Sequence, residues 1–284
     1  MENLYIPNTI SLVDLQNFNW CTSLKTVEFQ ERYDCSAHTM FWHCTNLETV
    51  ILPTTKVFGW SGWFLECPNI KTVTFLDVSE NEGFWDYNQQ FDLSDPKSCS
   101  FIIPEGKAEI FLRKGYMNLS DPSGLPLVVD EFESEAARIT DMANALNSGD
   151  KEMLSNAISE ARTIVNAAED YLTVYAQIAA IKSAAKNFLA SVTLSEDLDV
   201  TAAYIANPEF DRFAIGWKLP MIMDRIGYNP AIYTNENYQI DHFVEAWKGG
   251  SHDNGQFSQT ITNLPAGIYR LECDAVATWQ EDAS

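Results

Sequence analysis

The sequence predicts a multidomain chain: a solenoid of short parallel strands, then a small three-helix bundle, then an incomplete antiparallel β-sandwich. Three observations support this fold class. A gapless repeat occupies the first third of the chain, apolar residues with helical spacing fill the middle, and β-type sequence rich in aromatic residues and glycine follows. With 284 residues the chain is long enough for two or three domains, each with its own core.

The charge of the chain restricts the classes of partner. Lys and Arg number 18 while Asp and Glu number 40, so the net charge is −22. A chain this acidic repels phosphate backbones and anionic lipid headgroups. No stretch approaches the roughly 20 apolar residues that span a bilayer, and the N-terminus lacks the basic and apolar regions of a signal peptide. We therefore expect no nucleic-acid partner and no membrane insertion of these residues.

A unit of 23 residues recurs in the first third of the chain. Cys21, Cys44 and Cys67 fix the period, since 44 − 21 = 23 and 67 − 44 = 23. A phenylalanine precedes each cysteine by three residues, and three apolar residues follow it at constant offsets. A fixed period of about 20–29 residues indicates a solenoid in which each repeat forms one coil. The predicted repeat core is Phe18, Cys21, Leu24, Val27, Phe29, Phe41, Cys44, Leu47, Val50, Leu52, Phe64, Cys67, Ile70, Val73 and Phe75.

The end of each unit has the pattern of a short strand. In the first unit Val27 and Phe29 are two residues apart, so on a strand both point to the same inner face. Thr26, Thr49 and Thr72 then point outward and form a ladder, which suits the surface of a parallel sheet. We therefore predict one strand per coil, stacked about 4.8 Å apart.

The cysteines of the repeat have two interpretations. In stacked coils they form a column of small, buried side chains, which is the interpretation we favour. The alternative is a zinc site, because Cys35, His38, His43 and Cys44 lie close together in the sequence. Cys44 belongs to the repeat, however, and the other three residues lie in the variable part of the coil. We therefore predict free thiols and no metal or other cofactor in the solenoid.

The spacing Phe-x-x-Cys-x-x-Leu-x-x-Val-x-Phe/Leu, with Pro53 after one copy, resembles the BspA-type leucine-rich repeat. The resemblance covers residues 1–118, with an irregular coil at 76–97. It implies an extracellular or surface-exposed bacterial protein that adheres to host matrix proteins or to other cells. Repeat scaffolds bind through side chains on one face, and the sequence does not select the face.

The end of the array carries a further resemblance to the same family. Residues 99–107, followed by Phe111 and Tyr116, resemble the segment that closes such arrays. In the family that segment forms a short strand, a Pro-x-Gly turn and a helical turn whose aromatic side chains cap the last coil. The resemblance therefore implies that the solenoid ends near residue 118.

Residues 119–130 are predicted to be a linker, because Asp, Pro, Ser and Gly cluster there, and residues 131–193 a helical spacer. Three apolar series with spacings of three and four residues predict three helices. The second and third series are out of phase, so a break is expected near Asn166–Tyr171. The series are Phe132, Ala136, Ile139, Ala143 and Leu146; Leu154, Ile158, Ala161, Val165 and Ala168; and Val174, Ile178, Ile181, Ala185, Phe188 and Val192.

Three short amphipathic helices favour a small bundle with alanine-rich seams. A seam that joins two chains is the alternative. The segment resembles the helical spacers that separate modules of large bacterial surface proteins. No residue pattern in it indicates chemistry.

Residues 197–284 have β-type sequence. Residues 207–217, which contain Asn-Pro-Glu-Phe-Asp and Gly-Trp, and residues 257–271, which read as strand, tight turn and strand, resemble galactose-binding-like jelly-roll modules. Such modules accompany glycan-active bacterial enzymes. A jelly roll needs about eight strands, and residues 199–284 supply half to two-thirds of them. We therefore expect a truncated sandwich and a chain that is a fragment of a longer protein.

The resemblance to galactose-binding-like modules implies glycan binding at loops on one edge of the sandwich. Aromatic side chains there stack on sugars while polar groups bind hydroxyls, although packing in the core or rim is the other interpretation of each candidate. Asn207, Glu209 and Asp211 offer oxygen ligands for a structural calcium ion, and an ordinary turn explains them as well. The glycan-binding candidates are Tyr233, Tyr238, His242, Trp247 and Trp279.

The sequence contains no motif of catalysis: no Gly-x-Ser-x-Gly, phosphate-binding loop or His-Glu-x-x-His. A glycosidase needs two carboxylates across a cleft, which neither a solenoid nor a helical spacer offers. We therefore expect a non-catalytic surface or secreted binding protein that contacts proteins through the solenoid and glycans through the sandwich. The alternatives are the accessory binding region of a carbohydrate-active enzyme, with the catalytic domain outside these residues, and a purely structural stalk.

Overall fold

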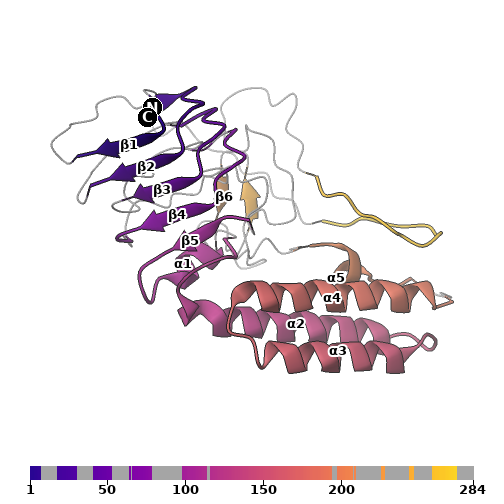
Figure 1. Ribbon diagram of the computed structural model, residues 1–284. Helices are drawn as coiled ribbons and strands as arrows, with labels where there is room; N and C mark the ends of the chain where they lie inside the picture. Colours follow the sequence, from indigo (N-terminus) through magenta and orange to yellow (C-terminus); the bar gives the residue numbers. More distant parts are fainter. Residues whose placement is uncertain are drawn as a thin grey trace, which may run out of the picture.

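The computed structural model describes residues 1–7, 18–30, 41–52, 64, 66–78, 98–113, 116–193, 197–206, 208, 225–227, 243–245 and 258–273. Short strands are stacked one above the other at the N-terminal end of the chain, and helices follow beneath the last strand (Figure 1). A parallel sheet and a group of helices are therefore the two main parts of the described structure.

Five strands form one parallel sheet in sequence order. The strands are β1 (Asn3–Ile6), β2 (Thr26–Phe29), β3 (Thr49–Leu52), β4 (Thr72–Phe75) and β5 (Ser100–Ile102). Thr26 pairs with Thr49 and Thr49 with Thr72, so neighbouring strands keep the register that the 23-residue period predicts. The prediction of one parallel strand per repeat is confirmed, and β1 precedes the first of the three predicted units.

The inner side of the sheet is a column of apolar side chains. Within the repeat core, Phe18 and Cys21 are half-buried and the other residues are buried. Phe18 stacks on Phe41 with ring centroids 5.7 Å apart, and Phe41 stacks on Phe64 at 5.9 Å. The same side chain therefore meets its own equivalent in the next coil, which gives each coil an identical packing layer.

Side chains also tie each coil to the one before it through backbone carbonyls. The Cys44 thiol donates to the Phe18 carbonyl oxygen at 3.0 Å. Two residues after Cys44, the Asn46 side-chain amide donates to the Thr22 carbonyl at 2.6 Å. The next coil repeats both bonds with Cys67 and Asn69. The described cysteines are free thiols.

The last coil is closed by α1 (Ala108–Arg113). Phe111 of this helix is fully buried, and its ring lies 5.1 Å from that of Phe75 in β4. The ring of Phe101 in β5 also stacks on the ring of Phe75. Aromatic side chains therefore cover the end of the repeat column, as the resemblance implied for this segment.

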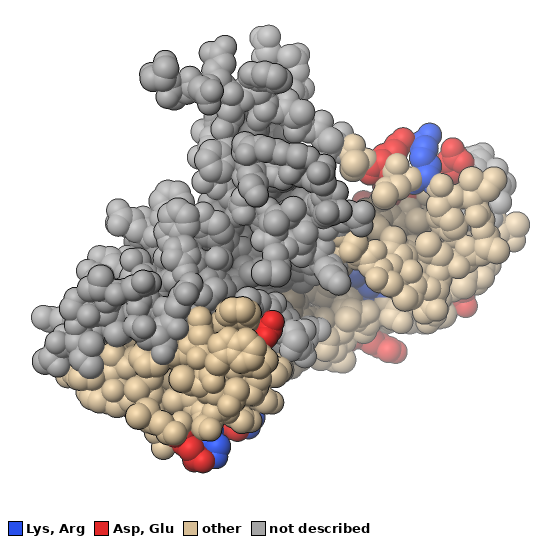
Figure 2. Space-filling model, turned by 90° about the horizontal axis from the view of Figure 1, so that it is seen from above, with Lys and Arg blue, Asp and Glu red and all other residues tan. Residues whose placement is uncertain are grey.

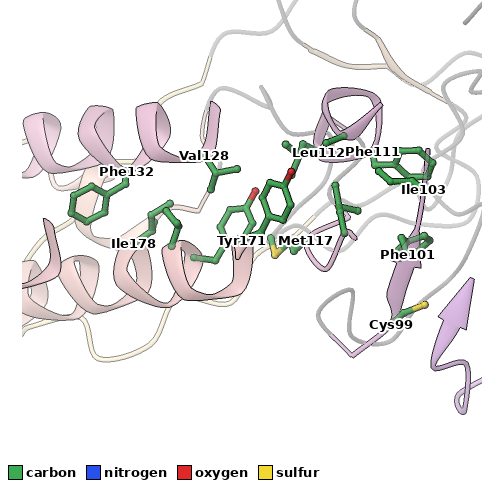
Figure 3. Packing of buried hydrophobic residues seen from close by; sticks show 14 of the residues in the cluster. Cys99, Phe101, Ile103, Phe111, Leu112, Met117, Val128, Phe132, Tyr171 and Ile178 are labelled. Atoms are coloured by element: carbon green, nitrogen blue, oxygen red, sulfur yellow. The ribbon is translucent and has the colours of Figure 1, made fainter. Parts of the chain in front are cut away.

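The core of the repeats continues into the helices without a gap. Buried residues of both parts form one cluster. In Figure 3 the side chains make a continuous row from Phe132 and Ile178, past Tyr171, to Phe111 and Phe101. The closing helix of the solenoid is thus also a packing surface for the helices that follow.

Three long helices follow the closing segment: α2 (Leu125–Asn144), α3 (Lys151–Val165) and α4 (Tyr171–Ala190). The predicted break near 166–171 is confirmed, because α3 ends at Val165 and α4 begins at Tyr171. Helix α4 packs against both α2 and α3. Asp150 and Asp170 cap α3 and α4 by accepting hydrogen bonds from backbone N–H groups of the first turn.

The predicted linker, residues 119–130, needs correction. Pro122–Gly124 form a short 3-10 helix, η3, and α2 begins at Leu125, six residues before the predicted start at 131. The Asp121 side chain caps η3, and proline is tolerated in the first helical turn, so the Asp-Pro-Ser-Gly-Leu-Pro sequence starts a helix here. A Cβ atom on Gly124 would meet Leu112 Cδ1 at 2.5 Å, which shows how closely this segment approaches α1.

The C-terminal third contributes smaller pieces. Helix α5 (Thr201–Tyr204) packs on α4, and β6 (Arg225–Gly227) pairs antiparallel with β7 (Phe243–Glu245). The hairpin predicted within 257–271 is not formed in the described part, because residues 259–273 contain no strand. Ile268 and Leu271 are exposed there, so the segment lacks the packed face that stabilises a two-stranded hairpin.

Candidate functional site

The outward-pointing side chains of β1–β5 form a regular surface of the repeats, which we call the sheet face. Strand pairing aligns them in two rows across the strands. Alternation along a strand places every second side chain on this side, and the residues between them are those of the core. The first row is Asn3, Thr26, Thr49, Thr72 and Ser100, and the second is Tyr5, Glu28, Ile51, Thr74 and Ile102.

The first row carries a hydroxyl or an amide on every strand. It contains the predicted ladder of threonines, with Thr49 between Thr26 and Thr72. The Thr26 hydroxyl donates to the Asn3 side-chain oxygen, so the row also bonds along itself. Except for Asn3, these side chains are half-buried. The row therefore offers donors and acceptors at the strand spacing, about 4.8 Å.

The second row is the more apolar. Tyr5 at one end is 55% exposed and Ile102 at the other is 45% exposed, and Ile51 between them is half-buried. Glu28 is the charged residue of the row. Figure 2 looks down on the repeats from the β1 end, where the described surface is largely uncharged and blue and red side chains lie together at one edge. Apolar groups bordered by polar ones are typical of a protein-binding surface.

Alternating charges run along the beginnings of the strands. Glu2, Lys25, Glu48 and Lys71 are separated by one repeat each, and we call them the charge ladder. Lys25 Nζ lies 3.2 Å from Glu2 Oε2, and Lys71 Nζ lies 2.8 Å from Glu48 Oε2. The hydrogen bond from Lys71 lowers the pKa of the Glu48 carboxyl. The ladder was not predicted, although its 23-residue spacing can be read from the sequence.

A second column, the flank column, consists of Trp20, His43 and Glu66. All three have left-handed backbone conformations, with φ of 63°, 59° and 57°. Large side chains at such positions cost about 1–3 kcal/mol each, which contacts must offset. The Trp20 and His43 rings lie 3.9 Å apart, and His43 Nδ1 lies 2.7 Å from Glu66 Oε2. The hydrogen bond with His43 lowers the pKa of the Glu66 carboxyl.

The stacked parallel strands, the 23-residue coils and the regular columns define the repeat type. Residues 1–88 match the BspA type leucine rich repeat region. The model for that region comprises six copies of the repeat, and the match includes β1 to β4. Comparisons with curated proteins and with solved structures found no match. Residues 1–88 are therefore similar to BspA-type leucine-rich repeats and form a BspA-like solenoid, while β5 and α1 lie beyond the matched residues.

The predicted glycan residues cannot be assigned to a site. Tyr233, Tyr238, His242, Trp247 and Trp279 lie outside the described residues, as do Asn207, Glu209 and Asp211 of the calcium prediction. The glycan and calcium sites thus stay predictions. None of the described helices is both long and apolar enough to cross a membrane.

The zinc alternative for the BspA-type repeats involves two described residues. His43 pairs with Glu66, and the Cys44 thiol donates to a backbone carbonyl, so each has another partner. Cys35 and His38 lie outside the described residues. Within the described part of the chain, no three His, Cys, Asp or Glu side chains are grouped to hold a metal ion.

Proposed function

We propose that this chain is a non-catalytic bacterial binding protein of the adhesion type, secreted or held at the cell surface, and that its BspA-type repeats contact a protein partner. The observation that carries the proposal is the sheet face, where Tyr5 and Ile102 expose apolar surface at the two ends of a largely uncharged row. Surface proteins rich in leucine-rich repeats use such regular faces for recognition.

The sheet face has the properties that a protein contact needs. Its backbone is held by pairing between strands, so the side chains are positioned before a partner arrives and little conformational entropy is lost on binding. The hydroxyls of the first row lie beside the apolar groups of the second, which suits an apolar centre with a polar rim.

Electrostatics restricts the partner further. The charge ladder at the border of the sheet face pairs Lys25 with Glu2 and Lys71 with Glu48, so it contributes little net charge. The chain as a whole carries −22. A basic or neutral protein surface is therefore favoured over an acidic one, and association with a basic partner should weaken as salt is added.

The remaining parts complete the proposal. Helices α2, α3 and α4 form a three-helix spacer between the repeats and the C-terminal residues. Those residues belong to a galactose-binding-like sandwich that contacts glycans through the aromatic candidates named above. The support for this second contact is the sequence pattern of residues 207–217.

Binding to an array of host extracellular-matrix proteins tests the solenoid contact. The variant Tyr5→Ser with Ile102→Ser removes the two exposed apolar groups of the second row without touching the core. The matched control, Met153→Gln with Ile164→Gln, removes two exposed apolar groups from α3. We expect the first variant to bind its matrix protein about ten-fold more weakly and the control to bind normally. Equal binding by all three proteins would exclude the sheet face as the contact.

A further inference from the structure

The contact between helix α5 and residues 259–263 is a feature that the proposed protein contact leaves unused. Ala206 and Gln259 are 53 residues apart in the sequence, and Tyr204 and Asn263 are 59 residues apart, yet each pair is hydrogen-bonded. We call these four residues the anchor. Such a contact decides whether the C-terminal residues follow the helices, because parts of one chain move relative to each other unless a packed contact joins them.

Helix α5 is itself held on the long helices. It packs on α4 and α2, and Figure 1 shows it lying against α4. Ala203 and Tyr204 are buried, so one side of this short helix is covered. Lys186 Nζ lies 5.2 Å from the centre of the Tyr204 ring, which is within the range of a cation–π contact. Helix α5 therefore cannot swing away from α4 without breaking these contacts.

Lys182 joins α5 to both long helices. Its Nζ lies 3.2 Å from Glu135 Oε2 on α2, and it donates at 3.4 Å to the carbonyl of Ile205, the C-cap of α5. The side chains of Glu135 and Lys182 are 9% and 19% exposed, so salt in the solvent screens this ion pair little. Movement of α5 away from the helices would take one of the two acceptors from the ammonium group.

Gln259 fastens the C-terminal residues to the end of α5 through two hydrogen bonds. The Ala206 N–H donates to the Gln259 side-chain oxygen at 2.8 Å, and the Gln259 side-chain N–H₂ donates to the Ala206 carbonyl at 3.0 Å. One side chain therefore satisfies both backbone groups of Ala206, as a paired strand would. The match requires an amide, because an amide supplies an acceptor and a donor side by side.

Two further contacts hold residues 259–263 in place. The Tyr204 hydroxyl donates to the Asn263 carbonyl at 3.4 Å, and Ile261 packs against the hydrophobic core. In the sequence Ile261 lies midway between Gln259 and Asn263, the two hydrogen-bonded residues. The segment is therefore attached along its length and not at one residue alone.

We propose that the anchor fixes the C-terminal residues to α2 and α4 at two points, Ala206 and Gln259, so that they move with the helices as one body and not on a flexible linker. The residues between the two points leave the helices and return at one place, so they have less freedom than a chain attached at one end. The repeats share a continuous core with the same helices. A partner that contacts both the repeats and the C-terminal residues must therefore match one fixed geometry. The inference goes beyond the proposed function and holds whichever partner the sheet face binds.

Relaxation of the backbone ¹⁵N nuclei in the full chain measures whether residues 259–263 tumble with the helices. We expect order parameters of about 0.85 both in α4 and in residues 259–263, and the same rotational correlation time for the two segments. Order parameters below about 0.6 in residues 259–263, or a shorter correlation time there than in α4, would overturn the proposal in favour of a flexible attachment.

Two variants test whether the anchor is the cause. Gln259→Ala removes both bonds to Ala206, so we expect lower order parameters in residues 260–263 and unchanged values in α4, which show that the fold is kept. Exchange of the Tyr204 and Ile205 N–H groups with deuterium should become about ten-fold faster. These two groups donate to Val200 and Thr201, so their exchange reports on how firmly α5 is held and not on the bonds removed.

Thr260→Ala is the matched control, because Thr260 follows Gln259 directly and its side chain is exposed. It should leave both the order parameters and the exchange rates as in the parent. Parent-like values in Gln259→Ala as well would show that the anchor does not hold these residues, which overturns the proposal.

Discussion

The Cys67 thiol donates a hydrogen bond to the Phe41 carbonyl oxygen, 2.9 Å away in the preceding coil. Cys44 makes the equivalent bond to Phe18. Both cysteines are buried, so the carbonyl that receives the bond has no water to replace it. The repeated cysteine thus has two roles, since it fills the column and satisfies a buried backbone acceptor.

Replacement of this cysteine should destabilise the repeats. Cys67→Ala removes the sulfur from a site that is 3% exposed and removes one of the two hydrogen bonds that the Phe41 carbonyl accepts, the other coming from the Cys44 N–H. We therefore expect a loss of about 1–2 kcal/mol in the free energy of unfolding. Cys21→Ala is the matched control, because Cys21 is half-buried and should cost less. Urea denaturation measures both. An equal loss at the two positions would show that burial in the column does not set the cost.

Thiol reactivity should separate the cysteines by burial. Burial raises the pKa of the Cys99 thiol to about 12, so almost no thiolate is present at pH 8. Cys273 is exposed. We expect a thiol reagent to label Cys273 within minutes in the folded protein and Cys99 only after denaturation, as measured by peptide mass spectrometry. Labelling of both at the same rate in the folded protein would contradict the buried position of Cys99.

Tyr171 should matter for the junction between the repeats and the helices. Its hydroxyl donates to the Asp121 carbonyl and accepts from the Gly124 N–H at 3.0 Å, and the residue is 3% exposed. Tyr171→Phe leaves two buried backbone groups without a partner, so we expect a loss of about 1–3 kcal/mol. Tyr269→Phe, which removes an exposed hydroxyl bonded to the Pro265 carbonyl, should change stability by less than about 0.5 kcal/mol.

Asp121 should make the same junction sensitive to acid. Burial raises the pKa of its carboxyl, but hydrogen bonds from Ser123 and from the Lys107 and Ala108 N–H groups outweigh burial and lower the pKa overall. A lowered pKa stabilises the fold above the pKa of the unfolded chain, about 3.9, and this stability is lost as the pH falls through the folded pKa. We therefore expect Asp121→Asn to be less stable than the parent at pH 7.

The difference between the parent and Asp121→Asn should shrink when urea denaturation is repeated near pH 3. Asp130→Asn, a substitution on the exposed side of α2, serves as the control and should cost little at pH 7. A difference for Asp121→Asn that is equally large at both pH values would show that the charge of the carboxylate is not what stabilises the junction.

The repeats were predictable because one physical constraint governs them. Val27, Val50 and Val73 must face the same core from equivalent positions on neighbouring strands. The period and the register therefore follow from the sequence alone. The start of α2 differs from the prediction because a cluster of proline and glycine favours a linker, although Asp121 followed by Pro122 is a helix-start signal. The packing of Gly124 against Leu112 of α1 depends on contacts across the fold, which local sequence does not encode.

The candidate surfaces were predictable only in part. The threonine ladder follows from strand alternation, and the 23-residue spacing of the charge ladder is visible in the sequence. The flank column could not be predicted from the sequence. Its backbone has a positive φ, a conformation that residue types such as those of Trp20, His43 and Glu66 rarely adopt. In the C-terminal third, the pattern within 257–271 favours strands, but a hairpin also needs a packed face, and Ile268 and Leu271 do not have one.

The alternating charge ladder has a consequence for how such an array can change in length. Removal of the one repeat that carries Lys25 would place Glu2 beside Glu48, a pair of like charges, whereas removal of two repeats would place Glu2 beside Lys71. Each exposed pair is weak, but its sign is fixed. The loss or duplication of two repeats therefore preserves the alternation of acidic and basic residues, whereas the loss or duplication of one repeat places two like charges side by side.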